Sequence, residues 1–151
     1  MPKKPLRPIQ SDAGRNRVYI DTSAWIAFFS ARDQNYGQAE RLFREAAARK
    51  VLLTTTNLVL AEVHHLILHR VGVAAAALAL DRIQSSARTS IVFASDAHHK
   101  AAMAWLAKLS GYRVTYTDAT GFAVIEDLKC AGFISFDSDF LLAGFIPWTP
   151  S

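Results

Sequence analysis

The sequence is poor in cysteine and in long apolar runs, and both absences narrow what the chain can be. Its single cysteine, Cys130, excludes an internal disulfide and a zinc site built from cysteines. No apolar run is long enough to span a membrane, and the first residues lack the apolar core of a secretory signal peptide. We therefore expect a protein of the reducing cytoplasm without a membrane segment.

What the sequence does contain is typical of one globular domain. Hydrophobic residues make up 51% of the 151 positions and charged residues 20%, so the chain can bury a substantial core. The formal net charge of +4 is compatible with a nucleic-acid partner without proving one. We expect residues 1–17, a basic leader containing several prolines, to be disordered, and residues 18–151 to form a single domain.

The hydrophobic pattern predicts strands that alternate with helices. Strands are expected at 18–20, 51–54, 90–93 and 133–136 and near 145–148, while 114–116 fits either a strand or a tight connection. Helices are expected at 22–30, 34–49, 57–70, from Gly72 to about Ser85, at 96–111 and at 118–131. The helix caps are expected to be Asp21, Asp33 and Asp96. This alternation with short loops predicts an α/β fold with a mainly parallel central sheet of four to five strands, flanked by helices.

Three aspartates stand where predicted strands meet helices. Asp21 follows a strand in VYIDTSAWIAFF, Asp137 follows another in FISFDSDF, and Asp118 begins a helix in VTYTDATGFAVIEDL. Ligands of a parallel sheet bind at the carboxyl ends of its strands. Each aspartate alone can be a helix cap, but clustered carboxylates repel one another unless a cation lies between them. Because Mg²⁺ and Mn²⁺ prefer oxygen ligands, the three together predict a divalent-metal site.

A fourth acid, Glu62, lies among apolar residues of the helix expected over 57–70. A glutamate in such surroundings lies either on a narrow exposed stripe or inward with a partner, and its position alone leaves both alternatives open.

The order and spacing of these motifs resemble the PIN-domain ribonucleases, and among them the toxins of bacterial and archaeal VapBC toxin–antitoxin pairs. The segments that carry the resemblance are DTSAWIAFF, DQNYGQA, TTTNLVLAEV, TDATGFAVIED and FISFDSDF, which together span roughly residues 18–148. Two features depart from the family pattern. Tyr36 stands where many relatives carry histidine, and the basic leader is not part of the usual pattern.

The resemblance implies a single PIN-like domain with an acidic site. Carried over by position, the catalytic quartet falls on Asp21, Glu62, Asp118 and Asp137, and Asp139 is a further acid near the metal. Asp21 and Asp118 are the implied direct ligands of one or two Mg²⁺ or Mn²⁺ ions. Two such ions held roughly 3.5–4 Å apart can activate water and neutralise the leaving oxygen of a phosphodiester. The implied supporting hydroxyls are those of Thr22, Ser23 and Thr120.

The predicted function is therefore a metal-dependent endoribonuclease that cleaves RNA phosphodiester bonds as the toxin of a type II toxin–antitoxin system. Its implied partners are RNA, a cognate antitoxin and a second copy of the chain. We expect part of the association surface to come from large aromatic residues. These are Trp25, Phe28, Phe29, Trp105, Phe145 and Trp148.

Two alternatives stay open at this point. One is a non-catalytic RNA-binding or scaffold module with the same fold. The other is a metal-dependent phosphatase of the haloacid dehalogenase type. That class needs a second aspartate two residues after the aspartate at the strand end, and Ser23 stands there.

Overall fold

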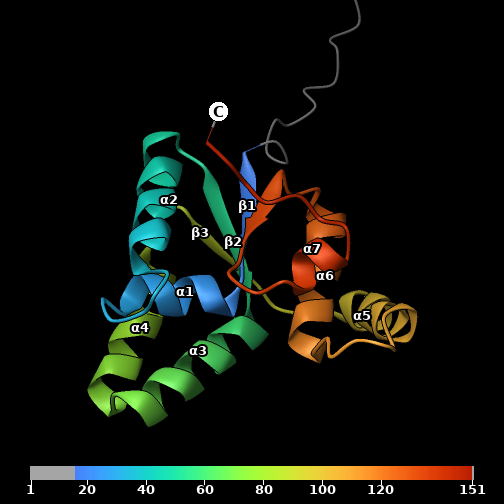
Figure 1. Ribbon diagram of the computed structural model, residues 1–151, viewed down its shortest axis with the longest axis horizontal. Coiled ribbons are helices and arrows are strands. Elements are labelled where there is room, and N and C mark those ends of the chain that lie inside the picture. Colours follow the sequence, from blue (N-terminus) through green and yellow to red (C-terminus); the bar gives the residue numbers. More distant parts are fainter. Residues whose placement is uncertain (1–15, 151) are drawn as a thin grey trace, which may run out of the picture.

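The computed structural model describes residues 16–150, which form a parallel sheet flanked by helices (Figure 1). Most of the predicted basic leader, residues 1–15, lies outside the described residues. The sheet has four strands in the order β3-β2-β1-β4, and every pair of neighbours is parallel. The predicted α/β class with a parallel sheet is therefore confirmed. The strands are β1 (Arg17–Ile20), β2 (Leu52–Thr56), β3 (Thr89–Val92) and β4 (Gly132–Ile134).

Within the described residues, seven helices connect and cover the strands. They are α1 (Thr22–Phe29), α2 (Tyr36–Ala48), α3 (Asn57–Arg70), α4 (Val73–Ser85), α5 (Asp96–Lys108), α6 (Tyr116–Leu128) and α7 (Asp139–Leu142). In Figure 1, α1, α2 and α4 lie on one side of the sheet, and α6 and α7 lie on the other. Among residues 16–150, no helix has both the length and the apolar character that a membrane crossing needs.

Strand β1 lies at the centre of the fold because it pairs with β2 on one edge and with β4 on the other. Its residues Val18, Tyr19 and Ile20 are completely buried. A strand that is covered on both faces has a continuous apolar sequence, which is the pattern that predicted it. The carboxyl end of this buried strand leads directly into Asp21.

Helix α6 approaches β1 unusually closely at Gly121. A Cβ atom at that position would lie 2.6 Å from the Tyr19 hydroxyl oxygen, which is shorter than any ordinary van der Waals contact. The ring of Phe140 packs on the same tyrosine, with 5.6 Å between the ring centroids. The missing side chain at Gly121 therefore lets the first half of α6 lie against β1.

Several predicted element boundaries are wrong because short polar residues stand side by side. Ser95, not Asp96, caps α5: its hydroxyl accepts a hydrogen bond from the His98 amide at 3.2 Å. Asp33 does not cap α2, which begins at Tyr36. Its carboxylate instead accepts the Asn35 amide at 2.8 Å in a local turn before the helix.

The chain near two predicted strands has a different structure. Val114 and Thr115 belong to the connection before α6, Thr115 caps that helix and Tyr116 begins it, so the strand alternative is excluded. The expected final strand is reduced to a single parallel bridge between Phe133 and Pro147.

Most of the aromatic residues expected at an association surface pack against one another, and that surface stays a prediction. Trp25 is only 3% exposed, and its ring centroid lies 5.1 Å from that of Phe43. The other expected rings are partly buried and pack against the core. The exposed large apolar side chains include Val73, Phe93, Met103, Tyr112, Leu141 and Ile146 instead.

Candidate metal centre

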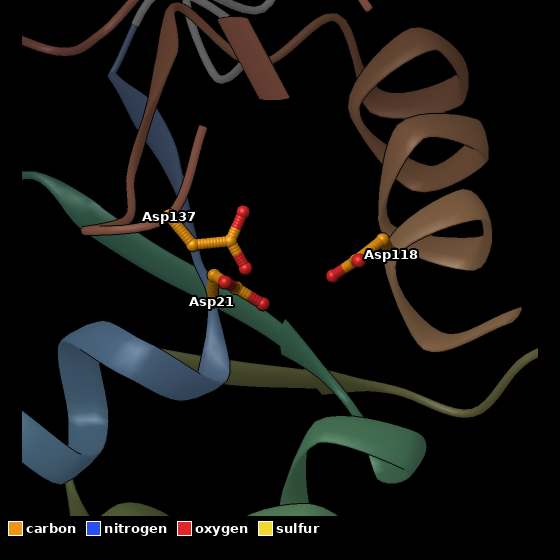
Figure 2. A group of neighbouring side chains, drawn as sticks. All are labelled: Asp21, Asp118 and Asp137. Atoms are coloured by element: carbon orange, nitrogen blue, oxygen red, sulfur yellow. The ribbon is translucent and has the colours of Figure 1, made fainter. Parts of the chain in front are cut away.

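Three aspartates from distant parts of the chain meet at the carboxyl edge of the sheet. Asp21 follows β1, Asp137 lies three residues after β4, and Asp118 lies in the first turn of α6. One carboxylate oxygen of each lies within 4.8 Å of the other two. Figure 2 shows the Asp118 side chain reaching from α6 toward Asp21 and Asp137. One cation between them can contact all three.

The parallel pairing of β1 with β4 brings the first and last of these aspartates together. Ile20 lies opposite Ile134 in the register, and the Asp21 amide donates to the Ile134 carbonyl at 3.1 Å. The segment after β4 therefore passes beside Asp21. Within that segment, the carboxylate of Asp137 accepts a hydrogen bond from the Asp139 amide at 2.8 Å.

The side chain of Asp21 serves the acidic cluster and not the helix that it precedes. Asp21 occupies the N-cap position of α1, but its carboxylate makes no cap hydrogen bond. It accepts instead the Ser135 hydroxyl at 2.9 Å. The prediction that the Asp21 side chain caps α1 is therefore wrong, because the carboxylate turns toward the residues after β4. Its backbone carbonyl still accepts the first helical amide, that of Ala24, at 3.1 Å.

Asp118 is oriented by a capping box at the start of α6. Its carboxylate accepts the Thr115 amide at 3.3 Å, and its own amide donates to the Thr115 hydroxyl at 3.1 Å. The first turn of a helix also favours negative charge. The backbone thus holds this carboxylate in place before any ligand arrives.

The charged form of this cluster is destabilised by its surroundings. Burial, the largest cause, and the neighbouring carboxylates together raise the pKa of Asp21 from 3.8 to about 7 and that of Asp118 to about 8. Burial also raises the pKa of Asp137, and the charge of Asp139 adds to this shift. A divalent cation would reverse these effects by neutralising the mutual repulsion. The donor set, which consists of anionic oxygens, is the set that Mg²⁺ and Mn²⁺ prefer.

Glu62 points inward and has a hydrogen-bonding partner, which decides between the two alternatives left open by the sequence. The Thr22 hydroxyl donates to Glu62 Oε2 at 2.7 Å. Helix α3 buries Val59, Val63 and Ile67, and Glu62 stands beside this buried stripe. Glu62 is not one of the three acids whose oxygens converge within 4.8 Å.

All the acids carried over by resemblance line one cavity of about 360 Å³, which we call the acidic cavity. They are Asp21, Glu62, Asp118, Asp137 and Asp139, and the lining also includes Thr22 and Ser23. Thr120 is completely buried and is not among the residues that line this cavity, and its hydroxyl donates to the Tyr116 carbonyl at 2.8 Å. Its expected supporting role remains a prediction.

Two further residues of the site were not singled out from the sequence. Ser135 holds the carboxylate of Asp21, and Arg70, in the last turn of α3, lines the acidic cavity. Ser135 lies two residues before Asp137, and Arg70 lies eight residues after Glu62. Since an α-helix has 3.6 residues per turn, a separation of eight residues puts Arg70 on a face of α3 close to that of Glu62.

Known proteins are similar to this chain over most of its length, and a solved structure shares its fold. The PIN domain family model matches residues 18–146. The 23S rRNA-specific endonuclease VapC20, found in two strains of Mycobacterium tuberculosis, is 34% identical over 137 residues, which cover 88% of this chain and 98% of that protein. The crystal structure of Mycobacterium tuberculosis VapC20, described as a sarcin–ricin loop cleaving toxin, matches with a TM-score of 0.79. Its sequence is 32% identical, and the match covers 88% of this chain and 99% of that chain.

The chain therefore belongs to the PIN domain family. Its resemblance to the VapC toxins, predicted from the motifs, is confirmed by both VapC20 matches. These relatives support the hypothesis of a ribonuclease toxin. They support neither the non-catalytic scaffold module nor the metal-dependent phosphatase.

Proposed function

We propose that the protein is a metal-dependent endoribonuclease and the toxin of a type II toxin–antitoxin pair. The observation that carries the proposal is the convergence of Asp21, Asp118 and Asp137 within 4.8 Å, in a cavity that Glu62 and Asp139 also line. The similarity to an endonuclease over 88% of the chain supports the same conclusion.

The cofactor in this proposal is Mg²⁺ or Mn²⁺, as one or two ions. Asp21 and Asp118 would hold an ion directly, with Asp137 beside them and Asp139 available for a second ion. When bound, the metal supplies an activated water near neutral pH and neutralises charge on the phosphate and the leaving oxygen. Glu62, which accepts a hydrogen bond from Thr22 and lines the acidic cavity, would accept a proton from the attacking water.

The proposed substrate class is the one named for the relatives. VapC20 is described as specific for 23S rRNA and as cleaving the sarcin–ricin loop. We propose the same loop as the substrate of this chain, and we place its action in the cytoplasm, where ribosomes are found. The chain's net positive charge of +4 favours association with any RNA backbone.

The test is cleavage of a synthetic RNA hairpin that carries the sarcin–ricin loop sequence. We expect cleavage with Mg²⁺ or Mn²⁺, none with a chelator, and none with the Asp118→Asn variant. Asp127→Asn is a matched control, because Asp127 lies on the same helix and contacts His98 outside the acidic cavity. Full cleavage by Asp118→Asn, or undiminished cleavage in chelator, would contradict the proposed metal centre.

The proposed assembly contains a cognate antitoxin and a homodimer. Val73, Phe93 and Ile146 are each at least 70% exposed, and exposed apolar side chains support association where they gather into patches. Twofold dimers are the commonest closed assemblies of soluble proteins. Light scattering should therefore report about twice the chain mass of 16.6 kDa. A monomer at micromolar concentration would contradict the dimer.

A further inference from the structure

A second cavity adjoins the acidic cavity and shares one wall with it. This side cavity, as we call it, has a volume of about 390 Å³ and lies between α1, α3 and α4. Ile26, Asp33 and Arg70 line both cavities. The two cavities therefore lie next to each other, and these three residues stand at their junction.

The lining of the side cavity combines apolar side chains with three basic side chains and one carboxylate, that of Asp33. Ile26, Ile67 and Ala79 are buried residues that form its apolar floor. Three exposed arginines stand around it, and within residues 16–150 none of them takes part in an ion pair. These arginines are Arg32, Arg70 and Arg82. Free guanidinium groups beside an apolar hollow suit a ligand that has both an anionic group and an uncharged ring.

Arg82 also offers a planar surface. Its guanidinium carbon lies 5.4 Å from the centroid of the Phe29 ring and 5.9 Å from that of Phe28. Such cation–π contacts hold a guanidinium group in place. In proteins that bind single-stranded RNA, unstacked bases lie on aromatic rings and on arginine planes of this kind.

The positive charge of Arg70 reduces the repulsion between an RNA phosphate and the carboxylates of the acidic cavity. An RNA phosphate that approaches several carboxylates is repelled unless cations compensate them. Within the described residues, Arg70 is the one basic side chain that lines the acidic cavity. Its position on the shared wall lets it contact a phosphate that lies between the two cavities.

We propose that the side cavity is a nucleotide subsite of the ribonuclease. It takes the unstacked base next to the scissile phosphate, while Arg70 binds a phosphate at the junction with the acidic cavity. The inference rests on the proposed RNA cleavage and adds a binding site to it. Its volume lies within the range of roughly 300–1,000 Å³ that is usual for small-ligand sites.

The first experiment removes the charge at the junction. Arg70→Gln should lower kcat/KM on the RNA hairpin by about tenfold or more, because it removes a charged hydrogen bond to phosphate. The slope of log KM against log salt concentration should also fall by about 0.7. The rise in melting temperature on Mn²⁺ addition should stay unchanged. Arg41→Gln is the matched control, because Arg41 is an exposed arginine of α2 that lines neither cavity.

The second experiment tests the base itself. Leu78 is 57% exposed and lines the side cavity, so Leu78→Trp should fill the cavity without disturbing the core. Placing an abasic nucleotide on one side of the cleaved bond should lower kcat/KM of the wild type by about tenfold. The same abasic substrate should cause no further loss in Leu78→Trp, because the base then has no site to occupy.

The outcomes separate the subsite from the proposed function. Equal losses in Arg70→Gln and Arg41→Gln, or additive losses for Leu78→Trp and the abasic substrate, would overturn the subsite while RNA cleavage stands. Normal cleavage by both variants with lost antitoxin binding would assign the side cavity to a protein partner and would also overturn the subsite.

If the wild type cleaves no RNA, the proposed function fails. Binding of an uncleavable 2′-O-methyl hairpin, compared between wild type and Arg70→Gln, then decides the subsite directly: weaker binding by the variant supports it, and equal binding overturns it.

Discussion

The Thr22 hydroxyl donates a 2.7 Å hydrogen bond to Oε2 of Glu62 and thereby ties the first turn of α1 to α3. Thr22 is 7% exposed, so water competes little for this bond. The orientation of Glu62 in the acidic cavity therefore depends on a neighbour that is itself neither an acid nor an expected metal ligand.

Thr22→Val should lower the rate of RNA cleavage by about tenfold, since a loose Glu62 would be a poorer proton acceptor. The substitution keeps the shape of the side chain and loses one hydrogen bond, so the free energy of unfolding should fall by only about 1 kcal/mol. Steady-state kinetics should show the loss in kcat and little change in KM. Thr22→Ser keeps the hydroxyl and should retain most of the activity; an equal loss in both variants would argue against the hydrogen bond.

Asp21→Asn should leave the metal-free protein as stable as the wild type or slightly more stable. The substitution removes a buried charge from a cluster of repelling carboxylates, and the amide oxygen can still accept the Ser135 hydroxyl. Cleavage activity and the Mn²⁺-induced rise in melting temperature should both be lost. Thermal melts in chelator and in Mn²⁺ measure the two effects, and a variant that melts far below the wild type in chelator would disprove the expected repulsion.

The stability of the metal-free protein should fall as the pH rises. The carboxyls of Asp21 and Asp118 lose their protons near pH 3.8 in the unfolded chain, but only near pH 7 and 8 in the folded protein. The folded state therefore binds more protons throughout this window, and the free energy of unfolding decreases from pH 3.8 to about pH 8. Melts in chelator should show a shallower decrease for Asp118→Asn. A wild type whose melting temperature rises steadily over the same range would refute the raised pKa values.

Gly121→Ala should destabilise the fold by about 1–3 kcal/mol, because the added methyl group overpacks the contact with Tyr19. Tyr19→Phe should be neutral or stabilising by itself, since the Tyr19 hydroxyl is buried without a hydrogen-bond partner among the described residues. The double variant should recover part of the loss. The recovery should be incomplete, because the ring carbon Cζ would still lie 2.8 Å from the new methyl group. Urea unfolding of all four proteins measures the coupling, and strict additivity would contradict the close contact.

The sequence predicted those helices and strands whose pattern is local and does not depend on contacts with distant parts of the chain. The apolar run of β1 and both ends of α3 were predicted within a residue, because a buried central strand and a helix that ends before Gly72 are local patterns. Helix caps were less predictable. Ser95 and Asp96 are both good caps by residue type, and only the backbone conformation decides which of two neighbours faces the free helix amides.

Asp21, Asp118 and Asp137 could be brought together from the sequence because strand–helix junctions of a parallel sheet share one edge. Glu62 and Asp139 were assigned only through the family resemblance. Arg70 and Ser135 were not recognised, although the spacing of Arg70 from Glu62 was available. Their place in the site depends on how α3 crosses α1 and on how the chain turns after β4. Both are properties of tertiary packing, which a single sequence does not encode in a short motif.

The pairing of the first strand with the last has a consequence for synthesis. Asp137 comes close to Asp21 only when β4 has paired with β1. A nascent chain in which β4 has not yet been synthesised therefore has an incomplete acidic cluster. The same holds for a copy truncated before Gly132. With the proposed metal centre, activity would therefore appear only after nearly the whole domain has folded, and a ribosome translating the message would not face a working enzyme while most of the chain is still emerging.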